Sequence, residues 1–247
     1  MRTTDALLLI HGFPLDATQW EPQETSLRDR VTTVAPHLPG FGGTDPAGDV
    51  MTMSAAATRC IEALDGAGAE RAVVCGLSMG GYVALELWRA HRDRVAGFVL
   101  ANTRGTPDDE AGKERRRALA ARLRGEGSEF LVHEPGPLLS DQADPESWER
   151  VRTIIAAQSP EALAAAALGM ADRPDSTPDL PGIDVPTLVV TSTGDTLIPP
   201  DQTAPMADVI PGAGFESIEG AGHLSNLEAP GEFTLILERH LTLCGLL

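Results

Sequence analysis

Short apolar runs alternate with longer amphipathic stretches along this chain, and few folds accommodate that pattern. Apolar runs of this length, with no polar residue at every second position, are typical of strands that helices bury on both faces. In a chain of 247 residues the alternation predicts an α/β fold around a mostly parallel sheet. We expect the strands at residues 6–10, 31–35, 72–75, 95–101, 187–191 and 214–218.

The segment between residues 106 and 181 interrupts this alternation. It is rich in Ala, Arg, Glu and Leu, and internal prolines such as Pro145 and Pro160 divide it into short helical stretches. We interpret residues 106–181 as a helical cap inserted into an α/β core of residues 1–105 and 182–247. Within the core we expect helices near residues 17–29, 53–64, 79–91 and 229–243.

The pentapeptide Gly76-Leu77-Ser78-Met79-Gly80 directly follows an apolar run and precedes a helical pattern. A strand that turns at once into a helix holds its serine on a tight, strained bend, and flanking glycines permit close backbone approach. The serine then stands at a helix N-terminus, where backbone dipoles favour negative charge. Ser78 is therefore the predicted nucleophile of a catalytic site.

A serine hydroxyl is a weak nucleophile at neutral pH, so it needs a base, and the base needs a carboxylate to fix its tautomer. His223 follows the last predicted strand, and Asp195 follows the strand at residues 187–191. Ser78, Asp195 and His223 each lie just beyond the carboxyl end of a predicted parallel strand, where open α/β sheets bind their ligands. We predict that these three residues form a catalytic triad.

Acyl transfer also requires hydrogen-bond donors for the oxyanion that develops on the substrate. One expected donor is the backbone N–H of Met79, which follows the nucleophile. The other is the backbone N–H of Phe13, in the loop after the first strand. His11 opens this loop, and we interpret it as a structural residue that fixes the loop rather than as a catalytic one.

Together these segments resemble the α/β-hydrolase superfamily, and within it the bacterial branch that includes 3-oxoadipate enol-lactonases and carboxylesterases. The similarity spans nearly the whole chain and implies hydrolysis of a carboxylic ester or lactone of a small molecule through an acyl-enzyme on Ser78. It implies neither a metal ion nor an organic cofactor. Haloalkane dehalogenases and epoxide hydrolases match less well, because they use an aspartate at the nucleophile position. The matching segments are residues 11–16, 39–45, 76–81, 194–195 and 222–228.

The sequence departs from this branch in two places. Its members begin with an antiparallel hairpin, whereas here only residues 1–5 precede the first strand, so we expect a shortened sheet. The strand at 31–35 would then lie at an edge that a partner covers or that stays open. The second departure is Asn102, which follows the strand at 95–101 where relatives carry an aspartate. Because an amide cannot serve as the triad acid, this residue favours Asp195.

Several alternatives stay open at this point. The same triad supports cofactor-independent perhydrolysis and carbon–carbon bond hydrolysis, and the fold also hosts ligand receptors whose triad is secondary. The first part of the cap is basic, and Arg115 and Arg122 are candidates for binding a substrate carboxylate. The alternative is a solvated helix face in which these arginines form ion pairs within the helix.

The composition of the chain limits the kinds of partner that it can bind. Lys and Arg number 19 against 36 Asp and Glu, a formal net charge of −17 that repels nucleic acids and anionic membranes. Residues 1–5 carry no basic region ahead of a long apolar run, and the apolar run at 6–10 is too short to span a bilayer. The sparse cysteines, Cys60, Cys75 and Cys244, indicate neither a disulfide framework nor a zinc site. We expect a cytoplasmic enzyme with no nucleic-acid or membrane partner, and a homodimer is an open alternative.

Overall fold

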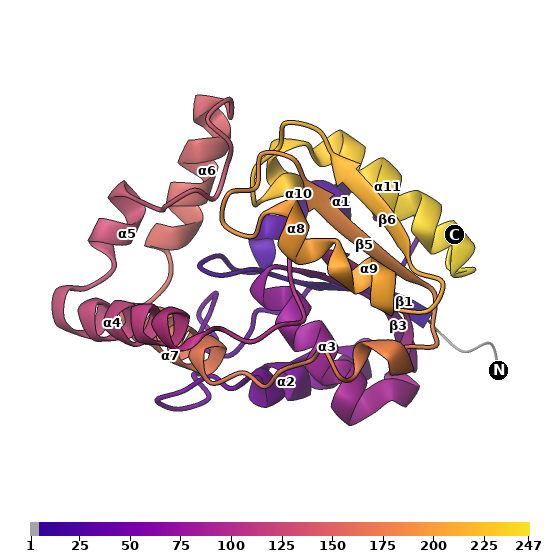
Figure 1. The fold of residues 1–247 in the computed structure, drawn as a ribbon, viewed down its shortest axis with the longest axis horizontal. Coiled ribbons are helices and arrows are strands. Elements are labelled where there is room, and N and C mark those ends of the chain that lie inside the picture. Colours follow the sequence, from indigo (N-terminus) through magenta and orange to yellow (C-terminus); the bar gives the residue numbers. More distant parts are fainter. Residues whose placement is uncertain (1–4) are drawn as a thin grey trace.

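The computed structural model describes residues 5–247, which contain a sheet of six parallel strands (Figure 1). Their order across the sheet is β2-β1-β3-β4-β5-β6. A strand forms at each of the six predicted places, which confirms the α/β fold. The expectation about the segment before the first strand rests on residues 1–5. Of these the structure describes only Asp5. The strands are β1 (Asp5–Ile10), β2 (Thr33–Val34), β3 (Arg71–Leu77), β4 (Val95–Ala101), β5 (Thr187–Ser192) and β6 (Gly214–Ile218).

The edge strand β2 is shorter than the sequence predicts. It lies at one end of the sheet, as expected, but only Thr33 and Val34 pair with β1. A two-residue strand leaves few unpaired backbone groups at the edge, and this limits pairing with other chains. The strand β3 is longer than expected and ends at Leu77, so that Ser78 follows it directly.

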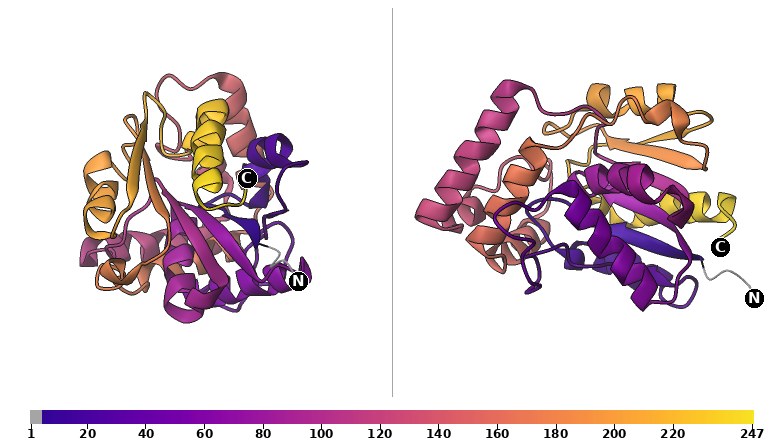
Figure 2. Two further views of the ribbon diagram at one scale, coloured as in Figure 1. Left: turned by 90° about the vertical axis from the view of Figure 1, so that its right-hand side faces the viewer. Right: turned by 90° about the horizontal axis from the view of Figure 1, so that it is seen from below.

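Helices cover both faces of the sheet (Figure 2). The predicted helix at 17–29 is divided into a 3₁₀ turn and α1, and Pro22, which has no N–H to donate, lies in the first turn of α1. Three short helices after β5 and β6 were not predicted. The helices outside residues 110–171 are η1 (Ala17–Trp20), α1 (Glu21–Leu27), α2 (Met53–Gly66), α3 (Met79–His91), η2 (Arg92–Arg94), η3 (Leu180–Gly182), α8 (Pro200–Thr203), α9 (Pro205–Val209), α10 (Ser225–Glu228) and α11 (Pro230–Leu243).

Strand β1 shows how the two faces are filled. Leu8 and Ile10 lie in the hydrophobic cluster that includes α2 and α3, whereas Leu7 and Leu9 lie in the cluster that includes α1 and α11. Successive side chains of a strand point to opposite faces. Because both faces of β1 are buried, apolar residues follow one another without a polar interruption.

Four helices, α4 (Glu110–Glu126), α5 (Glu129–His133), α6 (Pro145–Ala156) and α7 (Pro160–Ala171), lie together beside one end of the core (Figure 1). Helix α4 packs against α7, and α5 packs against α6. No single helix among residues 5–247 has the length and apolar composition to cross a membrane, although α6 and α7, bent by 97° at their junction, meet these criteria as a pair. The side chains that cap the starts of α4, α6 and α7 are Asp109, Asp144 and Ser159.

Candidate active site

The segments that carry the predicted site residues meet at the carboxyl edge of the sheet. Strands β1, β3, β4, β5 and β6 are neighbours in that order, and all run in the same direction. Their carboxyl ends therefore face the same side, where ligands bind in sheets of this kind. Along this edge the structure brings together, in order, Phe13, Ser78, Asn102, Asp195 and His223.

Ser78 occupies the sharp turn between β3 and α3. Its φ of 57° and ψ of −116° lie in a region that residues other than glycine rarely adopt, and such a conformation costs about 1–3 kcal/mol. Neighbouring groups hold it there. The Ser78 N–H donates to the carbonyl of Ala101 at 2.9 Å, and the Ser78 carbonyl accepts a hydrogen bond from Thr103 Oγ1 at 2.8 Å.

The two glycines of the pentapeptide determine how closely the backbone approaches here. A Cβ added at Gly80 would lie 2.1 Å from the carbonyl oxygen of Ile10, and one added at Gly76 would lie 2.3 Å from the carbonyl oxygen of Gly80. Real side chains do not make contacts this short. The turn that presents Ser78 therefore requires glycine at both positions, because β1, β3 and the start of α3 are in direct backbone contact.

Asp195 and His223 form a fully buried pair. His223 Nδ1 lies 2.8 Å from Asp195 Oδ2, and neither side chain is exposed. Asp195 Oδ1 accepts hydrogen bonds from the N–H groups of Leu197 and Ile198, each at 2.9 Å. A carboxylate partner places the ring proton on Nδ1 and leaves Nε2 as an acceptor. Nε2 is buried and has no hydrogen-bond partner within residues 5–247, so it is available to take a proton from a neighbouring group.

Asn102 belongs to the same network, a contact that the sequence did not predict. Its Nδ2 donates to Asp195 Oδ2 at 3.0 Å and to Ser192 Oγ at 2.7 Å, while its Oδ1 accepts from Ser225 Oγ at 2.6 Å. The amide thus donates to the oxygen that also contacts His223. Asn102 supports the position of Asp195 instead of replacing it.

Two backbone N–H groups adjoin the serine. A Cβ added at Gly12 would lie 3.4 Å from the Cβ of Ser78, so the loop after β1 touches the nucleophile. The next residue, Phe13, makes no backbone hydrogen bond through its N–H within the described residues. Met79 is the first residue of α3, and the first N–H groups of a helix have no intrahelical partner. Among the residues that the structure describes, neither the Phe13 N–H nor the Met79 N–H donates a backbone hydrogen bond, so both are available to a ligand.

His11 fixes the loop that carries Phe13. Its Nε2 accepts a hydrogen bond from the Leu38 N–H at 3.1 Å, and its Nδ1 donates to the Gly12 carbonyl at 3.2 Å. Burial lowers the pKa of His11 to about 4. His11 is therefore neutral at physiological pH, and it has the structural role that we inferred from the sequence.

The pH dependence of stability tests this role. The native state keeps His11 neutral down to about pH 4, whereas the unfolded chain binds a proton near the ordinary value of 6.5. Acid therefore favours the unfolded state, and stability is lost as the pH falls from 6.5 toward 4. Between pH 7 and pH 5 we expect the free energy of unfolding to fall by about 2 kcal/mol more in the wild type than in His11→Gln. Urea denaturation measures this difference, and equal losses in the two proteins would contradict the assignment.

A buried amide network connects the Phe13 loop to the loop of His223. Gln19 Oε1 accepts from the Gly12 N–H at 2.9 Å, and Gln19 Nε2 donates to Asn226 Oδ1 at 3.2 Å. Asn226 Nδ2 donates in turn to the Gln19 carbonyl and to Gln23 Oε1, each at 3.1 Å. All three side chains are fully buried. Asn226 follows His223 closely in sequence, so the network fixes the loops of the oxyanion donor and of the histidine relative to each other.

A family model described as "Alpha/beta hydrolase family" matches residues 7–234. The chain belongs to the α/β-hydrolase family. A solved structure of a thermophilic esterase from Thermogutta terrifontis, with malate bound, is 41% identical, has a TM-score of 0.93, and is matched over 98% of this chain and 91% of that chain.

Curated relatives of this α/β-hydrolase include an esterase and a lactonase. Pimeloyl-[acyl-carrier protein] methyl ester esterase from Aromatoleum aromaticum is 28% identical over 94% of this chain and 96% of its own length. The 3-oxoadipate enol-lactonase 1 from Acinetobacter baylyi is 27% identical over 94% of this chain and 86% of its own length. The resemblance to enol-lactonases and esterases that the motifs indicated is confirmed.

Ser78 of this α/β-hydrolase lines a hollow of about 450 Å³ between the core and the helices α4, α5 and α7. Leu119 and Leu131 line its helical side, and Arg115 lines it as well. Arg122, the other arginine selected from the sequence, is not among the lining residues. It pairs with Glu126, and its guanidinium lies 3.7 Å from the centre of the Phe130 ring.

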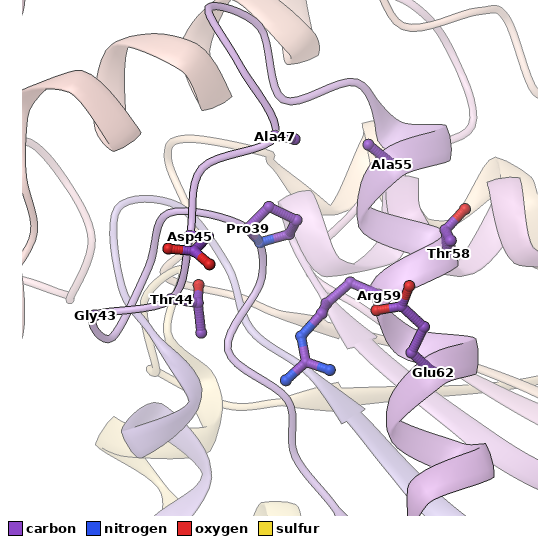
Figure 3. Close-up of a pocket in the computed structure, with 9 residues that line it drawn as sticks. All are labelled: Pro39, Gly43, Thr44, Asp45, Ala47, Ala55, Thr58, Arg59 and Glu62. Atoms are coloured by element: carbon purple, nitrogen blue, oxygen red, sulfur yellow. The ribbon is translucent and has the colours of Figure 1, made fainter.

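A second hollow, of about 540 Å³, lies between the loop of residues 39–47 and α2 (Figure 3). Its charged side chains are Asp45, Arg59 and Glu62, and no residue of the Ser78 site lines it. Within the described chain, no group of three or more His, Cys, Asp or Glu side chains is arranged to hold a metal ion.

Proposed function

We propose that this protein hydrolyses a carboxylic ester or lactone of a small molecule through an acyl-enzyme on Ser78. The observation that carries the proposal is the buried pair of Asp195 and His223, whose Nε2 has no partner in residues 5–247. This pair lies at the same edge of the sheet as Ser78, which has a strained backbone conformation and lines a hollow. A nucleophile, a base and the carboxylate that orients the base are the parts that serine-dependent acyl transfer needs.

In the first half-reaction Ser78 Oγ bonds to the carbonyl carbon while its proton passes to His223 Nε2. Asp195 stabilises the imidazolium that forms. The N–H groups of Phe13 and Met79 stabilise the oxyanion, a contribution of about 3–4 kcal/mol per donor in enzymes where one was removed. The carbon–oxygen bond of the ester then breaks, and the leaving alkoxide takes the proton from His223.

In the second half-reaction water attacks the acyl group on Ser78. His223 accepts a proton from this water, and the acid product leaves as Ser78 recovers its proton. The hydroxyl, the imidazole and the carboxylate return to their initial states, so the cycle requires no external oxidant or reductant.

We further propose that residues 106–181 act as the cap of this site. Helices α4, α5 and α7 supply Leu119, Leu131 and Met170 to the wall of the hollow, which suits the carbon chain of a small substrate. Of the two cap arginines considered from the sequence, we propose Arg115 as the substrate-binding residue. The ion pair of Arg122 with Glu126 supports α4 instead.

A substrate panel tests the proposal. We expect the purified protein to hydrolyse 4-nitrophenyl esters of short and medium chains and small lactones, and to act far more slowly in perhydrolysis of acetate with peroxide or in cleavage of dienoic diketones. Release of 4-nitrophenol and product mass spectra report the outcomes. Preferential carbon–carbon cleavage or perhydrolysis would replace the proposed reaction with one of the alternatives. Binding of these compounds without any turnover would indicate a receptor.

A further inference from the structure

Glu228, the last residue of α10, joins the cap to the segment that carries His223. Its Oε2 accepts hydrogen bonds from the N–H groups of Gly222 and Ser140, each at 2.9 Å. Its Oε1 accepts a hydrogen bond from the Ser140 hydroxyl. All three donors are neutral, and no Lys, Arg or His side chain among the described residues pairs with this carboxylate. One side chain therefore holds together two backbone segments that are distant in sequence.

The two segments are also in direct backbone contact. A Cβ added at Gly222 would lie 2.3 Å from the backbone nitrogen of Ser140. The N–H of Leu224 donates to the carbonyl of Leu138 at 2.8 Å. Gly222 and Leu224 are the neighbours of His223 in the chain, so residues 138–140 of the cap hold the chain on both sides of the base.

Gly222, the residue before His223, is held through both of its backbone polar groups. Its carbonyl accepts a hydrogen bond from Ser192 Oγ at 2.6 Å. The same Oγ accepts from Asn102 Nδ2 at 2.7 Å, so this carbonyl is tied to the network around the triad acid. The Gly222 N–H has Glu228 as its acceptor. Gly222 is buried, and a buried N–H that loses its acceptor is unfavourable, so the carboxylate keeps this peptide in place.

We propose that Glu228 is a positioning residue for the catalytic base, which fixes Gly222 against the cap and thereby fixes His223 relative to Ser78. The inference rests on the proposed hydrolysis at Ser78 and adds a residue that acts through His223. Glu228 is not among the residues that line the hollow, whereas Leu138 is. A displacement of about 1 Å in a reacting group costs up to about a hundredfold in rate. Loss of the Glu228 carboxylate therefore affects kcat more than KM.

Glu228→Ala and Glu228→Gln form the test. Alanine leaves two N–H groups without an acceptor, and we expect kcat for 4-nitrophenyl acetate to fall at least about tenfold while KM changes less than about threefold. In the glutamine variant the amide oxygen accepts from both N–H groups, and its NH₂ donates to the Ser140 hydroxyl, which accepts as well as donates. We expect Glu228→Gln to keep kcat within about threefold of the wild type.

The rate at which a fluorophosphonate modifies Ser78 is the second readout. It reports how well His223 activates the serine, and it does not depend on how an acyl chain packs against the cap. This rate should fall in Glu228→Ala by about the same factor as kcat and should stay near the wild-type rate in Glu228→Gln. Circular dichroism shows that each variant is folded. Glu228→Asp, whose carboxylate is one methylene shorter, should lose kcat in the same direction and replaces an alanine variant that does not fold.

Glu21→Ala is the matched control. Glu21 accepts a hydrogen bond from Arg150 of α6 at 2.8 Å, so it also joins the cap to the core. Among the described residues it has no hydrogen bond or ion pair with residues 220–228. Its kcat and labelling rate should equal those of the wild type.

Three results would overturn the role of Glu228 and leave the proposed hydrolysis intact. They are an unchanged kcat and labelling rate in Glu228→Ala, an equal loss in Glu228→Gln, and an equal loss in Glu21→Ala. A wild type that hydrolyses no ester contradicts both the role of Glu228 and the proposed hydrolysis.

Discussion

Replacing Ser78 with alanine is expected to reduce ester turnover by at least about ten-thousandfold, because the reaction loses the atom that forms the acyl-enzyme. The substitution removes only the hydroxyl. An alanine at this position would adopt the same backbone conformation with a Cβ of the same size, so the turn and its hydrogen bonds to Ala101 and Thr103 are kept. The measurement is release of 4-nitrophenol from a short-chain ester, with circular dichroism to show that the fold is retained.

The matched control for this variant is Ser54→Ala. Ser54 is exposed on α2 and is not among the residues that line the hollow of Ser78. We expect this variant to keep the wild-type rate. A folded Ser78→Ala protein with more than about a tenth of wild-type activity would show that another group is the nucleophile.

Asp195→Asn is expected to lower kcat at least about a hundredfold with little change in KM. The two backbone N–H groups that point at Oδ1 require an acceptor there, so the amide oxygen takes that position. The amide NH₂ then replaces Oδ2 and faces His223 Nδ1, which must give up its proton to accept the new hydrogen bond. The ring proton moves to Nε2, and Nε2 can no longer accept a proton from Ser78. In a serine protease whose triad aspartate was changed to asparagine, turnover fell by about ten-thousandfold for this reason.

The comparison with Asn102 separates the roles of the two residues. Asn102→Ala should be far milder, because Asp195 keeps its contacts with His223, Leu197 and Ile198. In the double variant Asp195→Asn with Asn102→Asp, a carboxylate returns within the same network, and recovery of kcat would show that it can orient His223 from β4. Near-normal kcat in Asp195→Asn together with an inactive Asn102→Ala would contradict the assignment of Asp195 as the triad acid. It would show that Asn102 is the residue on which His223 depends.

The residues next to the strands could be predicted because their chemistry follows from local sequence. Ser78 comes directly after β3, and Asp195 and His223 lie a few residues beyond the ends of β5 and β6. Parallel strands bring such positions to one edge of the sheet. The pentapeptide glycines are also local, since the turn around Ser78 depends on backbone contacts that only glycine allows. The fold and the arrangement of these residues therefore follow from periodicity and from one motif.

The support around these residues could not be predicted, because it depends on contacts between distant segments. Gln19 and Asn226 are 207 residues apart and carry no pattern that marks them as partners. Asn102 is a similar case. From the sequence we inferred only that its amide cannot act as the triad acid, and its contact with Asp195 was not predicted. Among the cap arginines, the sequence could not distinguish Arg115 from Arg122, since pairing depends on which carboxylates the fold places beside each of them.

The measurement that tests the central claim most directly is covalent labelling by a fluorophosphonate probe, read by intact-mass and peptide mass spectrometry. A phosphonate reacts with a serine that a neighbouring base has activated, and it leaves ordinary surface serines unmodified. We predict one adduct per chain on the wild type, located on Ser78. We predict no adduct on Ser78→Ala and a full adduct on Ser54→Ala. A wild-type protein that remains unlabelled, or one labelled equally after Ser78 is replaced, would contradict the assignment of Ser78 as the nucleophile.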